Sequence, residues 1–179
     1  MDAELASALT TYAARWPQEA ATVALFHTLL DDAQNPFQRE RLAGHFTASC
    51  WLVSADGARV LLTHHRKLGL WLQLGGHADG QRELSAAALR EAEEESGLAG
   101  LTIASDIFDL DRHRIPAHKA VPEHWHYDVR FVVRAGTDEV YTISEESLDL
   151  AWRDIAELAA DPDADPSVRR MAEKWLAQG

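Results

Sequence analysis

The sequence predicts an α/β protein in which a mixed β-sheet carries helices on its faces. Short segments of alternating or continuous apolar residues, typical of strands, occur on both sides of a central segment with helical spacing, residues 84–96. Further amphipathic helical patterns occupy the two ends of the chain. Because strand and helix patterns interleave along one chain, the helices are expected to pack on a sheet rather than on one another.

The first 40 residues are predicted to form a helical extension to a domain that spans residues 41–179. Two apolar stripes indicate two helices separated near Pro17. The stripes are Leu5, Leu9, Tyr12 and Ala13 in the first helix, and Val23, Phe26, Leu29 and Leu30 in the second. We expect this extension to pack against the rest of the chain. A lid or a contact in a homodimer is the alternative.

Six segments are predicted as strands: 45–53, 59–65, 71–74, 101–110, 126–135 and 148–154. Asp56 and Gly57 predict a hairpin turn between the first two strands. Gly75 and Gly76 follow the third strand and predict a turn before the central helix. Gly97 is expected to end that helix as a left-handed C-cap.

The C-terminal part is predicted to alternate between strand and helix in the same way. Asp154 is a predicted N-cap for a short helix over residues 155–160. A last amphipathic helix is expected from about residue 167 to 177. The residues predicted to face the body from this helix are Val168, Met171, Ala172, Trp175 and Leu176.

Composition and charge are consistent with a small enzyme and exclude several other classes. A chain of 179 residues with 46% hydrophobic content can bury a sizeable core. The net charge of −12 opposes binding to long nucleic acids, whereas small phosphorylated ligands remain compatible if cations offset the charge. The single cysteine, Cys50, excludes an intramolecular disulfide and is predicted to be a buried thiol.

The amino terminus has no features of a signal peptide, and no apolar run reaches the length that spans a membrane. A cytoplasmic location is therefore expected.

The central helix carries acidic residues at a spacing that suits a metal ion. Glu91, Glu94 and Glu95 stand at positions i, i+3 and i+4, so their carboxylates project from one face. A dication would relieve their mutual repulsion, and hard oxygen ligands favour Mg²⁺ or Mn²⁺ over zinc. Arg90 can neutralise part of this charge and fix a carboxylate rotamer. The small apolar stripe on the opposite side is Leu84, Ala88 and Ala92.

Residues 76–98 closely resemble the Nudix box. That pattern is a glycine, five residues, a glutamate, seven residues and then R-E-U-x-E-E-x-G-U, where U is aliphatic. The residues in register are Gly76, Arg90, Glu91, Ala92, Glu94, Glu95, Gly97 and Leu98. The chain departs from the pattern at Arg82, where the first glutamate is expected, although Glu83 follows one residue later and could take its place. The alternative is an acidic, solvated helix, which does not explain the paired glycines or the position of Arg90.

The resemblance covers roughly residues 45–160 and implies an α/β/α sandwich and a pyrophosphohydrolase that acts on acid anhydrides in phosphorus-containing compounds. The implied substrate is a small nucleoside diphosphate joined to another group, and the implied cofactor is Mg²⁺ or Mn²⁺. The implied metal ligands are the three carboxylates of the helix, a backbone carbonyl at Gly75 and an acidic residue of a later loop. Glu146 is predicted as that loop residue, with Glu145 as its rival. Either Glu94 or a loop glutamate is the general base.

Two other functional classes share the fold that the resemblance implies. A nucleotide-sensing module would bind without cleavage, but such a module is expected to lose the box carboxylates. A prenyl diphosphate isomerase would need a reactive cysteine, and Cys50 lacks the expected local sequence.

Several residues near the box are candidates for substrate binding. Arg66, Lys67 and Arg130 are candidates for contacting the distal phosphate, and Trp71 and Trp125 are candidates for stacking on a ring, although packing in the core is favoured for the two tryptophans. Exposed cations and core tryptophans are the ordinary alternative. The sequence does not identify which diphosphate is cleaved.

The chain contains nine histidines, several of them close to the presumed site. His64 and His65 precede the glycine pair, and His77 follows it as a predicted substrate contact. A further group consists of His118, His124, His126 and Asp128. The His-x-His spacing on a strand places two imidazoles on one face, which suits zinc or another transition-metal ion. Structural or phosphate-contacting histidines are the alternative.

Overall fold

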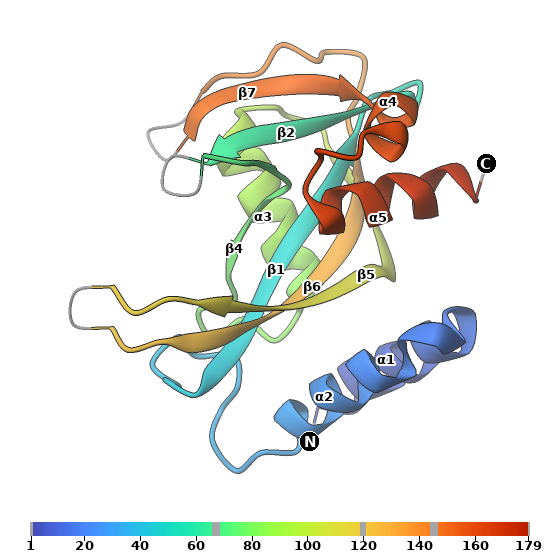
Figure 1. Cartoon of the computed structure of the whole chain (residues 1–179). Coiled ribbons are helices and arrows are strands. Elements are labelled where there is room, and N and C mark those ends of the chain that lie inside the picture. The colour runs from blue at the N-terminus through green and yellow to red at the C-terminus, as the bar shows by residue number, and fades with distance from the viewer. Residues whose placement is uncertain (1, 66–68, 119–120, 144–146, 179) are drawn as a thin grey trace.

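The computed structural model describes residues 2–65, 69–118, 121–143 and 147–178, and it contains a curled mixed sheet with helices on both faces (Figure 1). The strands are β1 (Gly44–Val53), β2 (Arg59–His65), β3 (Trp71–Leu72), β4 (Leu74–His77), β5 (Thr102–Ile115), β6 (His124–Arg134) and β7 (Ser147–Asp154). The sheet order is β3-β2-β1-β6-β5, with β4 paired to β1 and β7 paired to β2. The β1–β6 pair is parallel and the other pairs are antiparallel. The predicted fold class is confirmed.

The central strand β1 is buried along its whole length because both of its faces are covered. Its even-numbered residues, Phe46, Ala48, Cys50 and Leu52, belong to one apolar core. Trp51 and Val53 point the other way into a second core. His45, Thr47 and Ser49 share the parity of Trp51 and Val53, so the second face of this strand is polar at one end and apolar at the other.

The helices are α1 (Ala3–Arg15), α2 (Ala20–Leu30), α3 (Leu84–Ser96), α4 (Ile155–Ala160) and α5 (Pro166–Leu176), with a short 3₁₀ turn at Pro17–Glu19 between α1 and α2. The N-terminal helices and α3 contribute to the first core, whereas α4 and α5 pack on the second. In Figure 1, α3 accordingly lies behind the sheet and α5 lies in front of it. Phe26 of α2 contacts Phe46 of β1 and Tyr127 of β6, so the N-terminal extension shares the core of the sheet.

Several local predictions are confirmed by the dihedral angles and hydrogen bonds. Gly57, in the turn between β1 and β2, has φ +75°, and Gly97 ends α3 in the left-handed conformation with φ +68°. Asp154 caps α4 by accepting a hydrogen bond from the Glu157 N–H at 2.9 Å. Cys50 is a buried thiol.

Two local predictions are wrong. Gly75 and Gly76 do not form a turn, because they lie within β4 and pair with Ser49 and Ala48 of β1. In α5, Leu176 is 49% exposed, whereas Lys174 is only 5% exposed. The ammonium group of Lys174 is turned inward because it forms ion pairs with Asp109 and Glu19 there.

No helix within the described ranges of the chain is both long enough and apolar enough to cross a bilayer.

Candidate active site

Helix α3 lies close to the sheet because the side it presents is small. Leu84, Ala88 and Ala92 are buried as predicted, and Ala87 joins them. A stripe of alanines lets the helix backbone approach β1 and β4 closely. Carboxylates of the same helix consequently reach the strand that contains the glycine pair.

Gly76 is required by the position of the Glu91 carboxylate. A Cβ atom built on Gly76 would lie 2.5 Å from Glu91 Oε2 and 2.6 Å from its Cδ. A side chain at this position would therefore displace the carboxylate. Glu95 is held against the adjacent residue, since its Oε1 accepts a hydrogen bond from the Gly75 N–H at 2.8 Å. The glycine pair thus brings two acids of α3 against the backbone of β4.

Arg90 orders the acidic face of α3. Its guanidinium donates to Glu91 Oε1 at 3.0 Å, and its Nε lies 4.0 Å from Glu94 Oε1. The same group also contacts the Gln81 side-chain oxygen and lies 3.5 Å from the His77 carbonyl oxygen. Arg90 therefore links the helix to the segment that leads into it.

The contact with Gln81 bears on the residue that replaces the first glutamate of the box. Glu83 is the N-cap residue of α3, and its exposed side chain makes no capping hydrogen bond. Gln81 instead presents its amide oxygen to Arg90. The uncharged Gln81, one residue before the expected position, is thus the group that faces Arg90.

Glu94 completes the acidic face from a more exposed position, with 65% of its side chain accessible. Its carboxylate is therefore accessible to a ligand from solvent. The donor set of Glu91, Glu94 and Glu95 consists of hard anionic oxygens. Glu91 is already held by the Arg90 guanidinium and Glu95 by the Gly75 N–H. This set fits a small divalent cation such as Mg²⁺ or Mn²⁺.

The remaining predicted site residues are placed differently. Arg66, Lys67, Glu145 and Glu146 lie outside the described residues. Trp71 is half-buried on β3, where its ring stacks on His64 with centroids 5.1 Å apart. Trp125 forms a cation–π contact with Arg112, whose guanidinium lies 3.6 Å from its ring centre.

Arg130, predicted to contact phosphate, is only 1% exposed and lies in a buried ionic network. Its guanidinium lies 2.7 Å from Asp128, 3.2 Å from Asp109 and 3.5 Å from Asp111. Burial lowers the pKa of Arg130, but the three carboxylates outweigh this effect and raise it overall. Its surroundings correct the prediction: Arg130 is a structural ion-pair partner that solvent and ligand do not reach.

The same network ties both ends of the chain to the sheet. Asp109 accepts from Arg170 and from Lys174, each at 2.7 Å, and Lys174 also contacts Glu19 at 2.6 Å and the Tyr12 hydroxyl at 2.6 Å. Burial raises the pKa of Asp109, but these cationic partners outweigh burial and hold it below its ordinary value. Sequence periodicity does not reveal this network, because its members come from four distant segments.

Five histidines gather on one side of the sheet beside the glycine pair. His126 of β6 is paired in register with His45 of β1 on one side and with His113 of β5 on the other. His77 of β4 and His124 of β6 complete the group, with ring centroids 5.0 to 5.4 Å apart for the neighbouring pairs. Two histidines of the predicted group, His124 and His126, therefore lie in this group of five.

His118 lies outside this group, on an exposed part of the β5–β6 connection. His45 was missed by the sequence analysis, since only the parallel pairing of β1 with β6 brings it to His126.

Burial lowers the pKa of three members of the histidine group, His45, His77 and His126. It lowers the pKa of His77 to about 4 and that of His126 to about 2, and the neighbouring rings and Arg39 add to the effect at His77. Burial also lowers the pKa of His45. These three rings are neutral at physiological pH.

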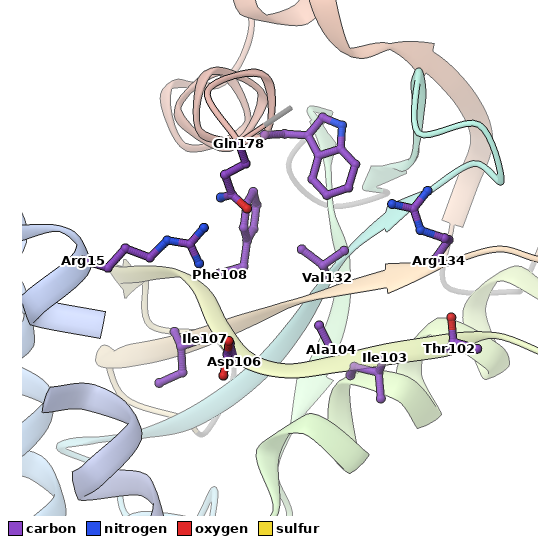
Figure 2. A pocket seen from close by; sticks show the side chains of 11 residues that line it. Arg15, Thr102, Ile103, Ala104, Asp106, Ile107, Phe108, Val132, Arg134 and Gln178 are labelled. Carbon is purple, nitrogen blue, oxygen red and sulfur yellow. The ribbon is translucent and has the colours of Figure 1, made fainter. Parts of the chain in front are cut away.

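A pocket of about 400 Å³ lies elsewhere, between β5, β6 and the end of α5 (Figure 2). Figure 2 shows Arg15 and Gln178 on one side and Ile103 and Ala104 on the other. The pocket contains no box carboxylate and no member of the histidine group. Because its lining offers no convergent set of reactive groups, we place the candidate site at α3 and β4.

Comparisons with known proteins found a matching family model and several similar solved structures. A family model described as NUDIX domain matches residues 44–175. A similar solved structure is an Ap4A hydrolase binary complex from C. elegans, with 18% identity, TM-score 0.59 and coverage of 74% of this chain and 96% of that one. A NUDIX-family hydrolase from Clostridium perfringens has 26% identity, TM-score 0.56 and coverage of 75% and 98%. The MutT protein from Methanosarcina mazei Go1 has 15% identity, TM-score 0.59 and coverage of 77% and 96%. No curated protein matches the chain.

Proposed function

The chain belongs to the NUDIX domain family, and on this premise we propose that it is a pyrophosphohydrolase that cleaves the phosphoanhydride bond of a small nucleoside diphosphate derivative with Mg²⁺ or Mn²⁺. The observation that carries the proposal is the arrangement of α3 on β4. Glu91 lies directly over Gly76, and Glu95 accepts from the Gly75 N–H. Two carboxylates are thereby held in fixed positions beside a third, Glu94.

In this proposal Glu91, Glu94 and Glu95 hold the cation, with the Gly75 carbonyl and Glu146 as further ligands. A bound divalent cation supplies charge neutralisation for the non-bridging phosphate oxygens and acidifies a coordinated water. Arg90 positions Glu91 through the 3.0 Å contact between its guanidinium and Oε1. A carboxylate positioned in this way needs little reorganisation during the reaction, which is the main source of electrostatic catalysis.

We propose Glu94 as the general base, with a glutamate of the 144–146 segment as the alternative. Glu94 is the most exposed of the three box acids, and its ion-pair contact within the described part of the chain is a long one, 4.0 Å from the Arg90 Nε. It is therefore the acid whose carboxylate is best able to reach a water and accept its proton. Glu91 and Glu95 are engaged with Arg90 and with the β4 backbone.

The substrate class remains at the level of small nucleotide derivatives. The similar structures include proteins titled Ap4A hydrolase, MutT and, from E. coli, dihydroneopterin triphosphate pyrophosphohydrolase. The names Ap4A hydrolase and dihydroneopterin triphosphate pyrophosphohydrolase each describe a compound with linked phosphates, and the two differ in the group attached to it. The linkage is therefore the part of the substrate that we carry over to this chain.

The two other classes receive less support. A sensing module would not need all three box acids in position. For the isomerase, Cys50 is fully buried and burial raises its pKa well above the ordinary value, so the thiol stays protonated. Such a cysteine does not suit proton transfer at carbon.

We also propose that residues 1–40 are an extension of a NUDIX domain at 41–179. The family match begins at residue 44, at the start of β1.

Glu94→Gln tests the function directly, with Glu93→Gln as its matched control. Both residues are exposed on α3, and both changes remove one charge at constant size. Phosphate release would be measured over a library of nucleoside diphosphate derivatives with Mg²⁺ and with Mn²⁺. Glu94→Gln should lower turnover by about two orders of magnitude or more, whereas Glu93→Gln should remain close to the unmodified enzyme. Equal turnover in the two variants would refute the assignment.

A further inference from the structure

The histidine group on the sheet has the geometry of a second metal site. His45, His77 and His126 each offer a ring nitrogen, and these three nitrogens all lie within 4.8 Å of one another. Two nitrogens that bind a tetrahedral zinc ion at its usual bond length are about 3.3 Å apart. Small side-chain rotations are therefore sufficient to bring the three nitrogens onto one ion. All three residues lie on paired strands, which hold their backbones rigidly.

The hydrogen bonds around His45 leave one ring nitrogen without a partner. Its Nδ1 lies 3.2 Å from the Arg41 carbonyl oxygen, which can only accept, so Nδ1 carries the proton. Nε2 therefore holds the lone pair. His45 is only 2% exposed, and its Nε2 has no hydrogen-bond partner among the described residues. A buried acceptor without a partner is costly, and a cation would satisfy it.

The tautomer of His126 follows from its contact with His124, whose own tautomer is set by a backbone carbonyl oxygen. Nδ1 of His124 lies 2.9 Å from the Pro122 carbonyl oxygen, so it carries a proton. In the neutral ring, Nε2 of His124 is then an acceptor, and it lies 3.2 Å from Nε2 of His126. His126 accordingly donates from Nε2 and keeps its lone pair on Nδ1. Ligating histidines commonly donate their second nitrogen to such an outer partner.

The group is chemically distinct from the carboxylate site on α3. Successive side chains of a strand point to opposite faces, so the His77 ring and the Glu91 carboxylate over Gly76 lie on opposite sides of β4. The donors of this group are imidazole nitrogens, whereas the site on α3 offers carboxylate oxygens. Imidazole donors favour Zn²⁺ and its neighbours in the first transition series, whereas Mg²⁺ prefers oxygen.

From these observations we propose that His45, His77 and His126 bind one divalent transition-metal ion of the Zn²⁺ class, with His124 as the outer partner of His126. The site is separate from the Mg²⁺ or Mn²⁺ site proposed above and does not depend on it. Three protein ligands leave one coordination position of a tetrahedral ion open.

Zinc titration of the full-length protein tests the proposal. After treatment with a chelator, calorimetry with Zn²⁺ should show one tight site per chain. His77→Gln and His126→Gln should each weaken that binding by about a hundredfold or more, because losing a ligand costs at least as much as the roughly 10- to 100-fold typical of losing an outer partner. His118→Gln is the matched control, because it removes an exposed histidine of the same β5–β6 hairpin, and its affinity should be unchanged. Glu94→Gln should also keep the site, which separates it from the box.

Cobalt spectroscopy gives an answer that does not depend on how the variants fold. Co²⁺ bound to the unmodified protein should show the intense visible bands of a nitrogen-ligated, four-coordinate ion, and Zn²⁺ should abolish them by displacement. Absence of a stoichiometric Zn²⁺ site, the weak spectrum of an oxygen-ligated ion, or loss of Zn²⁺ binding in Glu94→Gln with retention in His77→Gln would each overturn the proposal.

Discussion

The paired glycines of β4 differ in what an added methyl group would meet. A Cβ atom at Gly75 would lie 2.6 Å from Ser49 Cα, on the backbone of the neighbouring strand β1. A Cβ atom at Gly76 would instead meet the end of the Glu91 side chain. Because backbone cannot move aside cheaply and a carboxylate can, Gly75→Ala should lower the free energy of unfolding by about 1–3 kcal/mol. Gly76→Ala should change it by less than about 1 kcal/mol.

The effect of Gly76→Ala on catalysis follows from the displacement it forces. The built Cβ lies 2.5 Å from Glu91 Oε2, and real Cβ atoms essentially never come closer than 3.0 Å to such an atom. The carboxylate must therefore shift by at least about 0.5 Å, and its 3.0 Å contact with Arg90 must change with it. A displacement of about 1 Å in a catalytic array can cost about a hundredfold in rate. We expect a decrease in kcat of about 10- to 100-fold and a higher Mg²⁺ concentration for half-maximal activity.

Two measurements on the same pair of variants check this reasoning. Urea denaturation gives the stability of each variant, and phosphate release against Mg²⁺ concentration gives its activity. Mn²⁺ binding followed by electron paramagnetic resonance reports on the site without turnover. The reasoning fails if Gly76→Ala matches the unmodified protein in both metal dependence and rate. It also fails if Gly75→Ala is as stable as the unmodified protein.

Three further outcomes follow from the structure. Replacing Arg130 with Met should lower the free energy of unfolding by about 3–5 kcal/mol, since it leaves buried carboxylates unpaired, and urea denaturation would show this; a stable variant with only a raised KM would restore its role in phosphate binding. Acidification of the metal-free protein should destabilise it: the folded-state pKa values of His77 and His126, about 4 and about 2, lie below the ordinary 6.5, so the stability present above pH 6.5 is lost as the pH falls below it. At pH 5 each ring should account for a loss of about 1–2 kcal/mol relative to pH 7.5, and a urea midpoint that does not change between these values would contradict the shifts. Gln81→Ala should lower kcat several-fold while Glu83→Gln leaves it unchanged, and kinetics showing the reverse order would assign the role to Glu83.

Local sequence pattern was sufficient to predict the elements whose structure depends on residues close together in the chain. The small stripe of Ala88 and Ala92, the cap at Gly97 and the turn at Gly57 all follow from short-range stereochemistry. The strands other than β4 and the helical spacing of the acidic residues of α3 followed in the same way. The glycine pair was misread because glycine suits both a turn and a strand that another side chain closely approaches, and only the packing of Glu91 distinguishes them.

The remaining features depend on partners that are far apart in sequence. Lys174 and Arg130 read as ordinary exposed cations until the structure brings Asp109 to both of them. His45 joins His126 through a register between parallel strands, which no local pattern specifies. Ion pairs and histidine contacts between residues far apart in the sequence are therefore the features that local sequence periodicity does not predict.

The contact between Lys174 and the Tyr12 hydroxyl joins residues separated by 162 positions in the chain. During synthesis, Tyr12 of α1 is made long before Lys174. Its buried polar partner is therefore present only when nearly the entire polypeptide has been synthesised. Closing so long a loop is entropically slow, so this contact between α1 and α5 is expected to form late. Docking of α5 should thus be a late folding event, in which the Lys174 ammonium group connects the C-terminal helix to the N-terminal one.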